Sequence, residues 1–239
     1  MSILTQNFLN IRTKLWQALP AQPCLLCGTA SRNGIWCVAC DADLPYLTAP
    51  HCPICALPTL ASATCGSCLQ HAPAFDRTAA VFAYAFPLDR LVQALKYGQQ
   101  LVLVNSLADK LAQRVVIRPD CIVPMPLHPA RLRERGFNQS LELARRIGRK
   151  LHIPLLDNAC QRVRDTPPQA ALRWKERSGN VRRAFTCTAN LSGQHVAVVD
   201  DVMTSGASLQ ELALALRTAG AREVSAWVIA RTLPHSGDR

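Results

Sequence analysis

Apolar residues recur along the chain with two periods, which together predict alternating strands and helices from residue 76 onward. Four apolar runs predict strands, because they are too short for helices, at 78–86, 121–125, 196–199 and 223–229. Apolar positions three and four apart predict helices at 88–98, 101–116, 138–151 and 209–218, with Gly220 ending the last. The helix at 138–151 is predicted to start with a cap near Asn138, after an arginine-rich loop that contains Arg131, Arg133 and Arg135. This alternation is typical of a mainly parallel sheet with helices on both faces. The sequence therefore predicts an α/β domain over 76–239, with any site at the carboxyl ends of the strands.

Residues 1–20 predict an amphipathic helix, because five apolar residues recur at helical spacing: Leu4, Phe8, Ile11, Leu15 and Leu19. Arg12 and Lys14 interrupt this segment and no small-residue cleavage site follows, so we do not expect a secretory signal. Packing on its own protein is favoured for the helix, and a membrane-surface role is the minority alternative. No stretch approaches the roughly 20 apolar residues of a membrane span, so stable membrane insertion is not expected.

Eight of the eleven cysteines form two equally spaced sets, which predict metal sites rather than disulfides in a chain without an export signal. Each set reads CxxC, nine residues, CxxC, and the second set repeats the first after 28 residues: Cys24, Cys27, Cys37 and Cys40, then Cys52, Cys55, Cys65 and Cys68. Two CxxC pairs can close a tetrahedral Zn²⁺ site with no open position, which indicates structural zinc. Pairing within each set is favoured over a cross-braced arrangement.

Residues 21–72 are thus predicted to form a double zinc ribbon. Without zinc, residues 24–68 are expected to unfold while the α/β domain stays largely intact. The remaining cysteines, Cys121, Cys160 and Cys187, are predicted to sit singly as small core residues. This cysteine usage leads us to expect a cytoplasmic protein.

Asp200 and Asp201 follow a predicted strand, and a turn of small residues leads from them into the next helix. A helix N-terminus offers free backbone N–H groups and a positive dipole end to an anion. Gly206 lets the backbone approach a ligand, Thr204 and Ser208 add hydroxyl donors, and carboxylates at a strand end can bind sugar hydroxyls. The run is therefore predicted to bind a sugar phosphate. The alternative is an ordinary strand–turn–helix of a doubly wound fold, as in phosphatases or receivers.

Formal charge is concentrated in the middle of the chain. Of a net charge of +11, residues 120–186 contribute fourteen basic and six acidic side chains. Two four-thiolate zinc sites would carry about −2 each, which makes the cysteine segment locally acidic. A solvated charged face is the ordinary explanation of such a surplus, but its concentration beside a predicted phosphate site favours anion binding.

The run Val196–Ser208, V-A-V-V-D-D-V-M-T-S-G-A-S, resembles the phosphoribosyl-pyrophosphate (PRPP) signature of type I phosphoribosyltransferases. Two further blocks, P-x-P-L-H…R-x-R-x-R-G-F-N-Q from Pro124 and R-x-R-x-T from Arg162, extend the resemblance to the ComF/GntX family. These competence-associated, phosphoribosyltransferase-like proteins carry an N-terminal zinc ribbon. The resemblance implies a type I phosphoribosyltransferase-like fold, with ribose hydroxyls on the two aspartates and the 5′-phosphate on the turn. The PRPP-binding set implied in this way is Asp200, Asp201, Val202, Met203, Thr204, Ser205, Gly206, Ala207 and Ser208.

The resemblance also implies transfer at the anomeric carbon of PRPP, with Mg²⁺ held largely by the substrate's own oxygens. An oxocarbenium-like transition state needs a stabilised pyrophosphate, and the candidate contacts are Arg133, Arg135, Arg162 and Arg164. The process implied is DNA uptake or utilisation, with single-stranded DNA and DNA-uptake or helicase machinery as partners. The acceptor, and whether any base is transferred, stay open.

Two other functions are consistent with the residues: a non-catalytic module that binds single-stranded nucleic acid, and a PRPP-sensing regulator. The basic segment suits contact with the phosphates of a strand, although aromatic stacking partners are few. The predicted nucleic-acid surface is Arg145, Arg146, Arg149 and Lys150. No helix-turn-helix supports the regulator, which ranks last.

Overall fold

The computed structural model describes residues 21–32, 34–98, 100–164 and 183–234. The chain divides into two compact units, residues 1–44 and 45–239, and the second cysteine set belongs to the larger one. The predicted helix at 1–20 lies outside the described residues. The predicted domain boundary at residues 72–76 follows the cysteine repeat and stays a prediction. Across the described ranges, no helix is both long and apolar enough to cross a membrane.

The smaller unit is a hairpin followed by a short helix. Strand β1 (Gln22–Pro23) pairs antiparallel with β2 (Ala30–Ser31), and α2 (Val38–Ala42) follows. Trp36 is buried, and its indole Nε1 donates to Asp41 Oδ1 at 2.7 Å. The segment after β1 carries the first CxxC pair of this unit, and the start of α2 carries the second.

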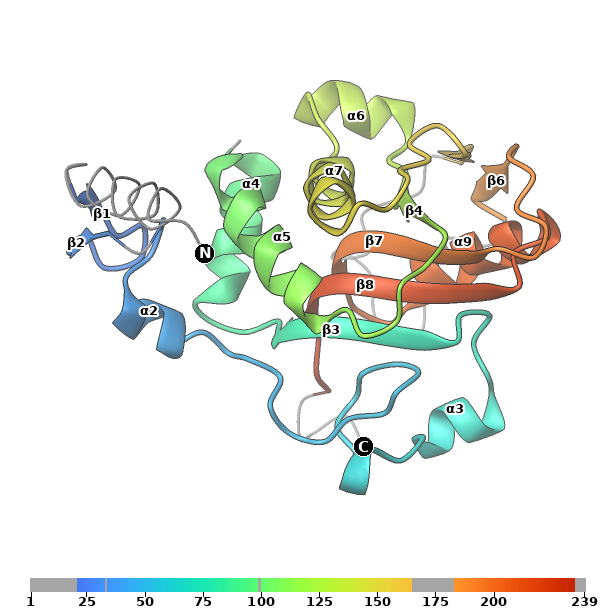
Figure 1. The fold of residues 1–239 in the computed structure, drawn as a ribbon, viewed down its shortest axis with the longest axis horizontal. Helices are drawn as coiled ribbons and strands as arrows, with labels where there is room; N and C mark the ends of the chain where they lie inside the picture. The colour runs from blue at the N-terminus through green and yellow to red at the C-terminus, as the bar shows by residue number, and fades with distance from the viewer. Residues whose placement is uncertain (1–20, 33, 99, 165–182, 235–239) are drawn as a thin grey trace, which may run out of the picture. The chain divides into compact units, whose positions relative to one another are not determined.

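A four-stranded parallel sheet forms the centre of the larger unit, in the order β3–β8–β7–β4 (Figure 1). Its strands are β3 (Arg77–Ala83), β4 (Cys121–Pro124), β7 (His195–Met203) and β8 (Glu223–Arg231). The pairing of β7 with β8 continues to Met203 and Arg231, whereas β4 ends opposite Val199. The inner strands β7 and β8 are buried along most of their length, as expected for a parallel sheet covered on both faces.

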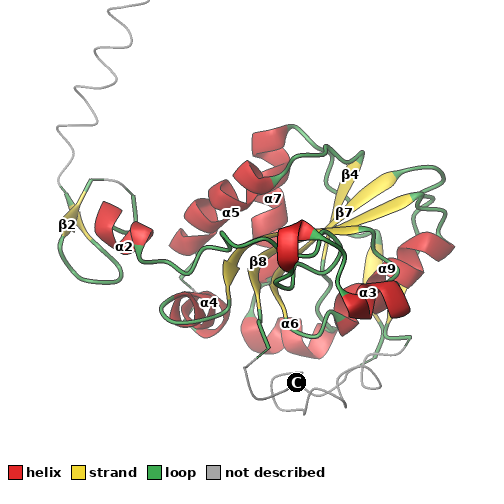
Figure 2. Cartoon of the chain, turned by 90° about the horizontal axis from the view of Figure 1, so that it is seen from below, coloured by secondary structure: helices red, strands yellow, loops and turns green. Residues whose placement is uncertain are grey.

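Helices cover both faces of this sheet, as predicted. Figure 2 shows α5 (Val102–Arg114) and α7 (Gln139–Leu151) on one side and α9 (Ala207–Thr218) on the other. On the first side, α5 packs on β3 and β8, α7 packs on β4 and β7, and α4 (Leu88–Tyr97) packs on α5. Fully buried residues four apart, Leu103, Leu107 and Leu111, form the apolar face of α5.

The end of α9 confirms the role predicted for Gly220. Its φ is +98°, and its N–H donates to the carbonyl of Arg217 at 3.0 Å. The N–H of Ala221 donates to the carbonyl of Leu216 at 3.0 Å, which completes a Schellman cap. A Cβ on Gly220 would lie 2.9 Å from the Cα of Ser192, so a side chain there would require a shift of the backbone.

The second cysteine set is built into the core of the larger unit. It lies around η1 (Leu60–Ser62) and α3 (Gly66–Gln70). Cys52, Cys55 and Cys68 belong to a hydrophobic cluster that includes side chains of β7, β8 and α9. This packing argues against the expectation that the second set unfolds apart from the α/β domain, and that expectation stays a prediction.

Two further predictions about local structure are wrong. Strand β7 does not end at Val199 but runs through both aspartates to Met203, because β8 offers it a paired edge that far. Residues 131–135 form the last part of a helix, α6 (Pro129–Arg135), rather than an arginine-rich loop. A proline at its first position and the left-handed Gly136 after its end fix its bounds.

The remaining cysteines do not all sit singly. Strand β5 (Cys160–Arg162) pairs antiparallel with β6 (Phe185–Cys187) in a separate two-stranded sheet, where Cys160 lies directly opposite Cys187. Burial and the neighbouring Cys187 raise the pKa of Cys160. Cys121 is buried on β4, as predicted for a core residue, and burial raises the pKa of its thiol to about 11.

Candidate functional site

Asp201 is buried near the carboxyl end of β7 and accepts three hydrogen bonds. Its Oδ2 accepts from Lys96 Nζ at 2.7 Å and from Gln139 Nε2 at 3.3 Å, and its Oδ1 accepts from the N–H of Val202 at 2.7 Å. Lys96 lies in the last turn of α4 and Gln139 in the first turn of α7, so two helices converge on one carboxylate. Burial opposes the charged form of Lys96, but Asp201 outweighs this effect and the pKa of Lys96 is raised. Asp201 therefore holds a protonated lysine at this edge of the sheet.

Asp200 is half-buried and keeps one carboxylate oxygen for a ligand. Its Oδ1 accepts from Ser140 Oγ and from the N–H of Asp201, both at 2.9 Å. Within the described part of the chain, no donor reaches its Oδ2. Burial and then the charge of Asp201 raise the pKa of Asp200 to about 7, against the opposing effect of Lys96. Asp200 therefore changes its charge near neutral pH.

Asn138 places both helix residues that contact the aspartates. Its Oδ1 accepts from the N–H groups of Ser140 at 3.0 Å and Leu141 at 3.4 Å, which confirms the cap predicted near this position. Its Nδ2 donates to the carbonyl of Met125, the residue after β4, at 3.0 Å. The start of α7 is thereby tied to the end of β4, and Gln139 and Ser140 reach neighbouring carboxylates on β7.

Arg135, a predicted pyrophosphate contact, lies beside this cluster. Its Nη1 donates to Gln139 Oε1 at 2.7 Å, and its guanidinium lies 5.2 Å from the centre of the Tyr97 ring. Since Gln139 also donates to Asp201, hydrogen bonds connect Arg135 to the acidic pair. A second predicted contact, Arg133, is exposed on the same helix.

The turn between β7 and α9 has a backbone that only glycine adopts easily. Gly206 has a φ of +83°, and a Cβ there would lie 2.9 Å from Met203 Cε. The hydroxyl residues Thr204, Ser205 and Ser208 around it are half-buried. This turn presents its backbone and hydroxyl groups at the start of a twelve-residue helix, as an anion-binding turn requires.

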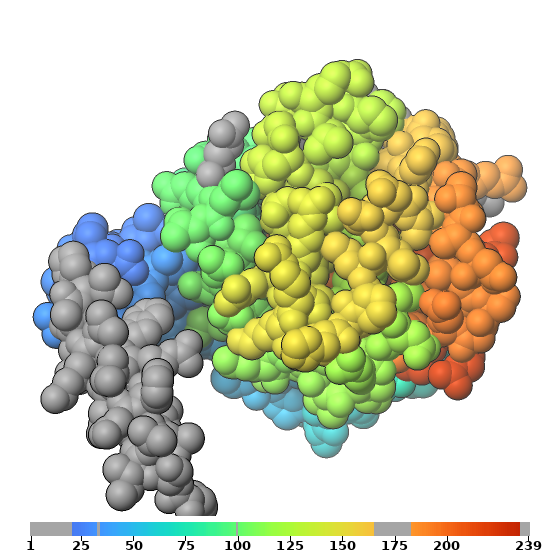
Figure 3. All heavy atoms as spheres, turned by 45° about the horizontal axis from the view of Figure 1, so that its top comes forward, coloured from blue at the N-terminus to red at the C-terminus, as the bar shows by residue number. Residues whose placement is uncertain are grey.

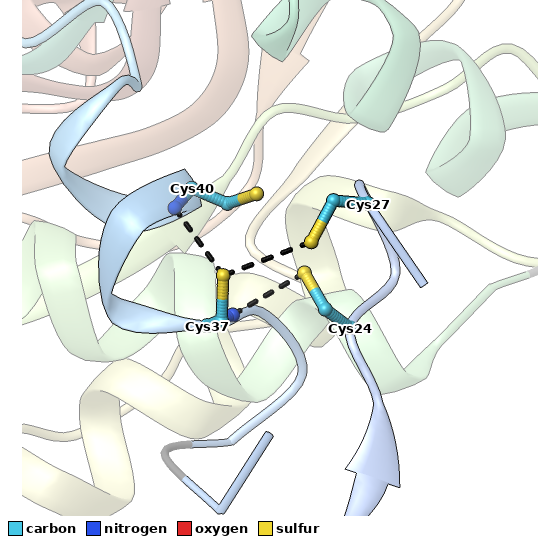
Figure 4. Close-up of side chains that lie close together, drawn as sticks. All are labelled: Cys24, Cys27, Cys37 and Cys40. Carbon is cyan, nitrogen blue, oxygen red and sulfur yellow. Dashed lines mark hydrogen bonds between the residues drawn. The ribbon is translucent and has the colours of Figure 1, made fainter. Parts of the chain in front are cut away.

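Each cysteine set brings four sulfur atoms together, which confirms pairing within each set. The ligand atoms of each set all lie within 4.8 Å of one another. Figure 4 shows the first set, with its four side chains gathered around one point. Cys27 and Cys37 have sulfur atoms 3.8 Å apart, and those of Cys55 and Cys65 are 3.6 Å apart. Zn–S bonds of about 2.3 Å in a tetrahedron place sulfur atoms about 3.8 Å apart, so both sites fit structural zinc.

Backbone N–H groups point at sulfur in the first set. The N–H of Cys37 donates to Cys24 Sγ at 3.3 Å, and that of Cys40 donates to Cys37 Sγ at 3.4 Å. Burial opposes ionisation of Cys24, but backbone hydrogen bonds lower its pKa to about 6. Because zinc binds the thiolate form, this arrangement favours the metal.

We expect reduced, freshly purified protein to contain two zinc ions per chain by elemental analysis. Cys37→Ser should remove one ion and leave the unfolding of residues 45–239 unchanged, because that cysteine lies in the smaller unit. Cys65→Ser should also remove one ion, but it should lower the melting temperature of the larger unit by about 10 °C. A content well below one zinc per chain would contradict both sites.

The four basic residues predicted to bind nucleic acid lie along α7, in the yellow part of Figure 3. Asp109 on α5 lies 2.8 Å from Lys150 Nζ and 3.4 Å from Arg146 Nη2. Burial alone would raise the pKa of Asp109, but these two cations lower it. Arg145 contacts two further carboxylates, at 2.7 and 3.8 Å, and Arg149 donates to a backbone carbonyl. Carboxylates thus neutralise much of the charge on this helix.

The other two predicted pyrophosphate contacts lie in or beside the two-stranded β5–β6 sheet. Arg162 ends β5, with its guanidinium 5.6 Å from the centre of the Phe185 ring. Arg164 is exposed two residues later. Their assignment to pyrophosphate, like that of Arg133, stays a prediction.

Three residues that contact the acidic pair were not predicted: Lys96, Gln139 and Ser140. Gln139 and Ser140 belong to the R-G-F-N-Q-S run, and its resemblance to the family was the signal that could have found them. Lys96 is the basic residue in the last turn of a helix whose apolar face is buried. That position is also favourable for the helix itself, so the sequence alone does not distinguish a site residue there.

Comparison with known proteins agrees with both halves of the chain. Residues 15–69 match the double zinc ribbon domain model, and residues 138–236 match the phosphoribosyl transferase domain model. The DNA utilization protein YhgH of Escherichia coli K12 is 34% identical over 221 residues, covering 88% of this chain and 97% of that protein. Competence protein F of Haemophilus influenzae is 33% identical over 213 residues, covering 84% of this chain and 92% of that protein.

A more distant relative is competence protein ComFC of Bacillus subtilis, which is 25% identical and covers 87% of this chain and 95% of that protein. Among solved structures, glutamine PRPP amidotransferase from B. subtilis covers 52% of this chain and 25% of its own, at 23% identity and a TM-score of 0.37. That likeness is too distant to support a conclusion about this chain. The identity to YhgH and competence protein F along nearly their whole length is sufficient: the chain belongs to the ComF/GntX family, with an N-terminal double zinc ribbon and a phosphoribosyltransferase-like domain.

Proposed function

We propose that PRPP binds with Mg²⁺ where β7 leads into α9. Asp200 accepts hydrogen bonds from the ribose hydroxyls, and the turn from Thr204 to Ser208 binds the 5′-phosphate. The observation that carries this proposal is the carboxylate of Asp200, which is held by Ser140 through one oxygen while the other is left for a ligand. The left-handed Gly206 and the N-terminus of α9 support the phosphate assignment.

Asp201 has a different role in this proposal from the ribose contact that the family resemblance implies. Its two oxygens already accept three hydrogen bonds within the protein, and it is 4% exposed. We assign it to hold Lys96 protonated. The ammonium of Lys96 and the guanidinium of Arg135 then supply fixed positive charge close to the ribose site, where a departing pyrophosphate develops negative charge. Mg²⁺ bound to PRPP would add further charge neutralisation.

The process in which this site acts is inferred from relatives. Proteins named for DNA utilization and for competence match this chain over most of its length. We infer that the chain takes part in the uptake or utilisation of DNA, with PRPP as its small-molecule ligand. Much of the α7 charge is neutralised by neighbouring carboxylates, which disfavours that helix as a strand-binding surface. The PRPP site therefore ranks above the nucleic-acid-binding module.

Calorimetry with PRPP and Mg²⁺ tests the proposed site. Gly206→Ala should weaken PRPP binding by about tenfold or more, because the new Cβ collides with Met203 and strains the turn. Gly193→Ala is the matched control, since Gly193 also has a positive φ, has open space around it and lies away from the turn. Equal PRPP affinity in the parent and in Gly206→Ala would overturn the phosphate assignment.

Catalysis is tested by pyrophosphate release. The protein is incubated with PRPP, Mg²⁺ and a panel of nucleobases or single-stranded nucleic acids. Release that depends on the acceptor identifies a transferase, whereas PRPP binding without release identifies a sensor or binding module.

A further inference from the structure

Arg231, the last residue of β8, connects the second cysteine set to the phosphate-binding turn. It is 2% exposed, so its guanidinium is buried. Its Nε donates to the carbonyl of Cys55 at 2.7 Å. Its Nη1 donates to the carbonyl of Met203 at 3.0 Å and also contacts the carbonyl of Thr204. One side chain thus joins a zinc-ligand residue to the beginning of the turn.

A second connection runs through Thr78 on β3. The N–H of Thr78 donates to the carbonyl of Pro53 at 3.0 Å, and its hydroxyl donates to the carbonyl of Ile54 at 2.5 Å. The same hydroxyl lies 4.0 Å from Met203 Sδ. The three carbonyls from Pro53 to Cys55 therefore all bond to the sheet, through Thr78 and Arg231.

Met203 carries this support to the turn itself. Its Cε occupies the space that a Cβ on Gly206 would need, at 2.9 Å, so Met203 packs directly against the turn. Its carbonyl also accepts from the N–H of Thr232 at 3.0 Å, which closes the end of the β7–β8 pairing. Met203 thus lies between the turn and two residues, Arg231 and Thr78, that bond to backbone carbonyls of residues 53–55.

The surroundings of Arg231 also point to that set. Within the described ranges, no carboxylate lies within salt-bridge distance of this guanidinium. Its Nε donates to the backbone of Cys55, one of the four cysteines whose sulfur atoms lie together in that set. A buried cation requires a compensating charge, and a four-thiolate zinc site carries about −2. The hydrogen bonds of Arg231 and Thr78 described above lie within the larger unit, to which the second cysteine set belongs, whereas the first set belongs to the smaller unit.

We infer that Arg231 is a positioning residue for the 5′-phosphate turn, and that the second zinc site, but not the first, is required for PRPP to bind there. This inference rests on the proposed function. The second ribbon then supports the ligand site, and loss of its metal weakens PRPP binding although no residue that contacts PRPP is substituted.

The test compares equivalent cysteines of the two sets in the full-length protein. Cys37→Ser and Cys65→Ser each remove a ligand at the same position of the repeat. Zinc content, hydrogen exchange of a peptide covering residues 203–208, and PRPP–Mg²⁺ affinity are measured for each. Cys65→Ser should raise exchange in that peptide and weaken PRPP binding by about tenfold or more, whereas Cys37→Ser should leave both unchanged.

Arg231→Lys keeps the charge and leaves both cysteine sets intact. It therefore tests whether Arg231 holds the turn even if Cys65→Ser does not fold. It should raise exchange over 203–208 by about tenfold while exchange over 139–151 on α7 stays as in the parent. Unchanged exchange over 203–208 in Arg231→Lys would overturn the inference. If the parent does not bind PRPP, the proposed function fails, but the exchange comparison still decides whether Arg231 holds the turn.

Discussion

Asp201→Asn is expected to lower the free energy of unfolding by about 2–3 kcal/mol near pH 6, because it leaves the largely buried Lys96 ammonium without its carboxylate. When one partner of a buried ion pair is removed, the desolvation free energy of the other is no longer compensated. This applies to Lys96, whose side chain is only 22% exposed. Near pH 6 Asp200 is mostly protonated, since its pKa is about 7, so relief of repulsion between the aspartates does not mask the loss. Urea unfolding of the parent and the variant measures the difference.

A double-mutant cycle with Lys96→Met isolates the pair. The double variant should be less destabilised than the sum of the two single variants, with a coupling energy of about 2 kcal/mol. Asp89→Asn on the same helix as Lys96 is the matched control, and its effect should stay below about 0.5–1 kcal/mol, because Asp89 is only partly buried in the first turn. Strict additivity of Lys96→Met and Asp201→Asn would show that the contact contributes nothing.

The strands and long helices could be predicted from the sequence because local pattern and packing agree there. Helix α7 has apolar residues at helical spacing, a capping Asn138 and a buried face, and it was predicted to within one residue. Strand β7 was predicted too short, because the apolar run stops at Val199 while the strand continues through two carboxylates. What extends the strand is its pairing with β8, which is a long-range property that a local pattern does not contain.

Helix α6 was missed although its sequence carries two end signals. Pro129 and Gly136 stand at positions favoured at the start and just after the end of a helix. Between them, Leu132 is the only large apolar residue, so no amphipathic face indicates a helix, and the arginines suggested a loop. The difference bears on the site, because Arg135, the last residue of α6, contacts Gln139, the first residue of α7.

The cluster around the acidic pair could be predicted only in part. The two aspartates lie in one recognisable run, but Lys96 and Gln139 are about a hundred and about sixty residues earlier in the chain. Nothing in the spacing of one sequence indicates which helix end meets which strand end. The two cysteine sets illustrate the same limit, since their spacing is identical although only the second shares the core of the larger unit.

Asp200→Asn is expected to act on stability in the opposite direction from Asp201→Asn. Both hydrogen bonds of the Asp200 carboxylate end on Oδ1, so the amide oxygen of asparagine can accept them while the charge is removed. The pKa of Asp200 is about 7 in the folded protein, whereas an unfolded aspartate titrates near 4. Between these values the folded state binds more protons than the unfolded state, so this group destabilises the parent increasingly as pH rises from about 4 to 7.

Asp200→Asn lacks that pH dependence, so its stability relative to the parent should increase from about pH 4 to 7 and then level off, at about 2 kcal/mol above the parent near pH 8. Unfolding in urea at several pH values measures this difference. The PRPP affinity of the parent should rise over the same pH range in which Asp200 lowers its stability. The parent should bind PRPP–Mg²⁺ about tenfold more tightly near pH 8 than near pH 6, because only ionised Asp200 accepts both ribose hydroxyls.

The variant should bind PRPP at least about tenfold more weakly than the parent near pH 8, with no step in affinity near pH 7 beyond that of PRPP itself. PRPP titrates identically in both experiments, so a step present in the parent and absent in Asp200→Asn belongs to this carboxylate. If the half-buried carboxylate of Asp200 serves ligand binding at the expense of stability, Asp200→Asn should be more stable than the parent and bind PRPP more weakly. A variant that is less stable than the parent near pH 8, or that binds PRPP equally well, would show that Asp200 supports the fold and does not contact the ribose.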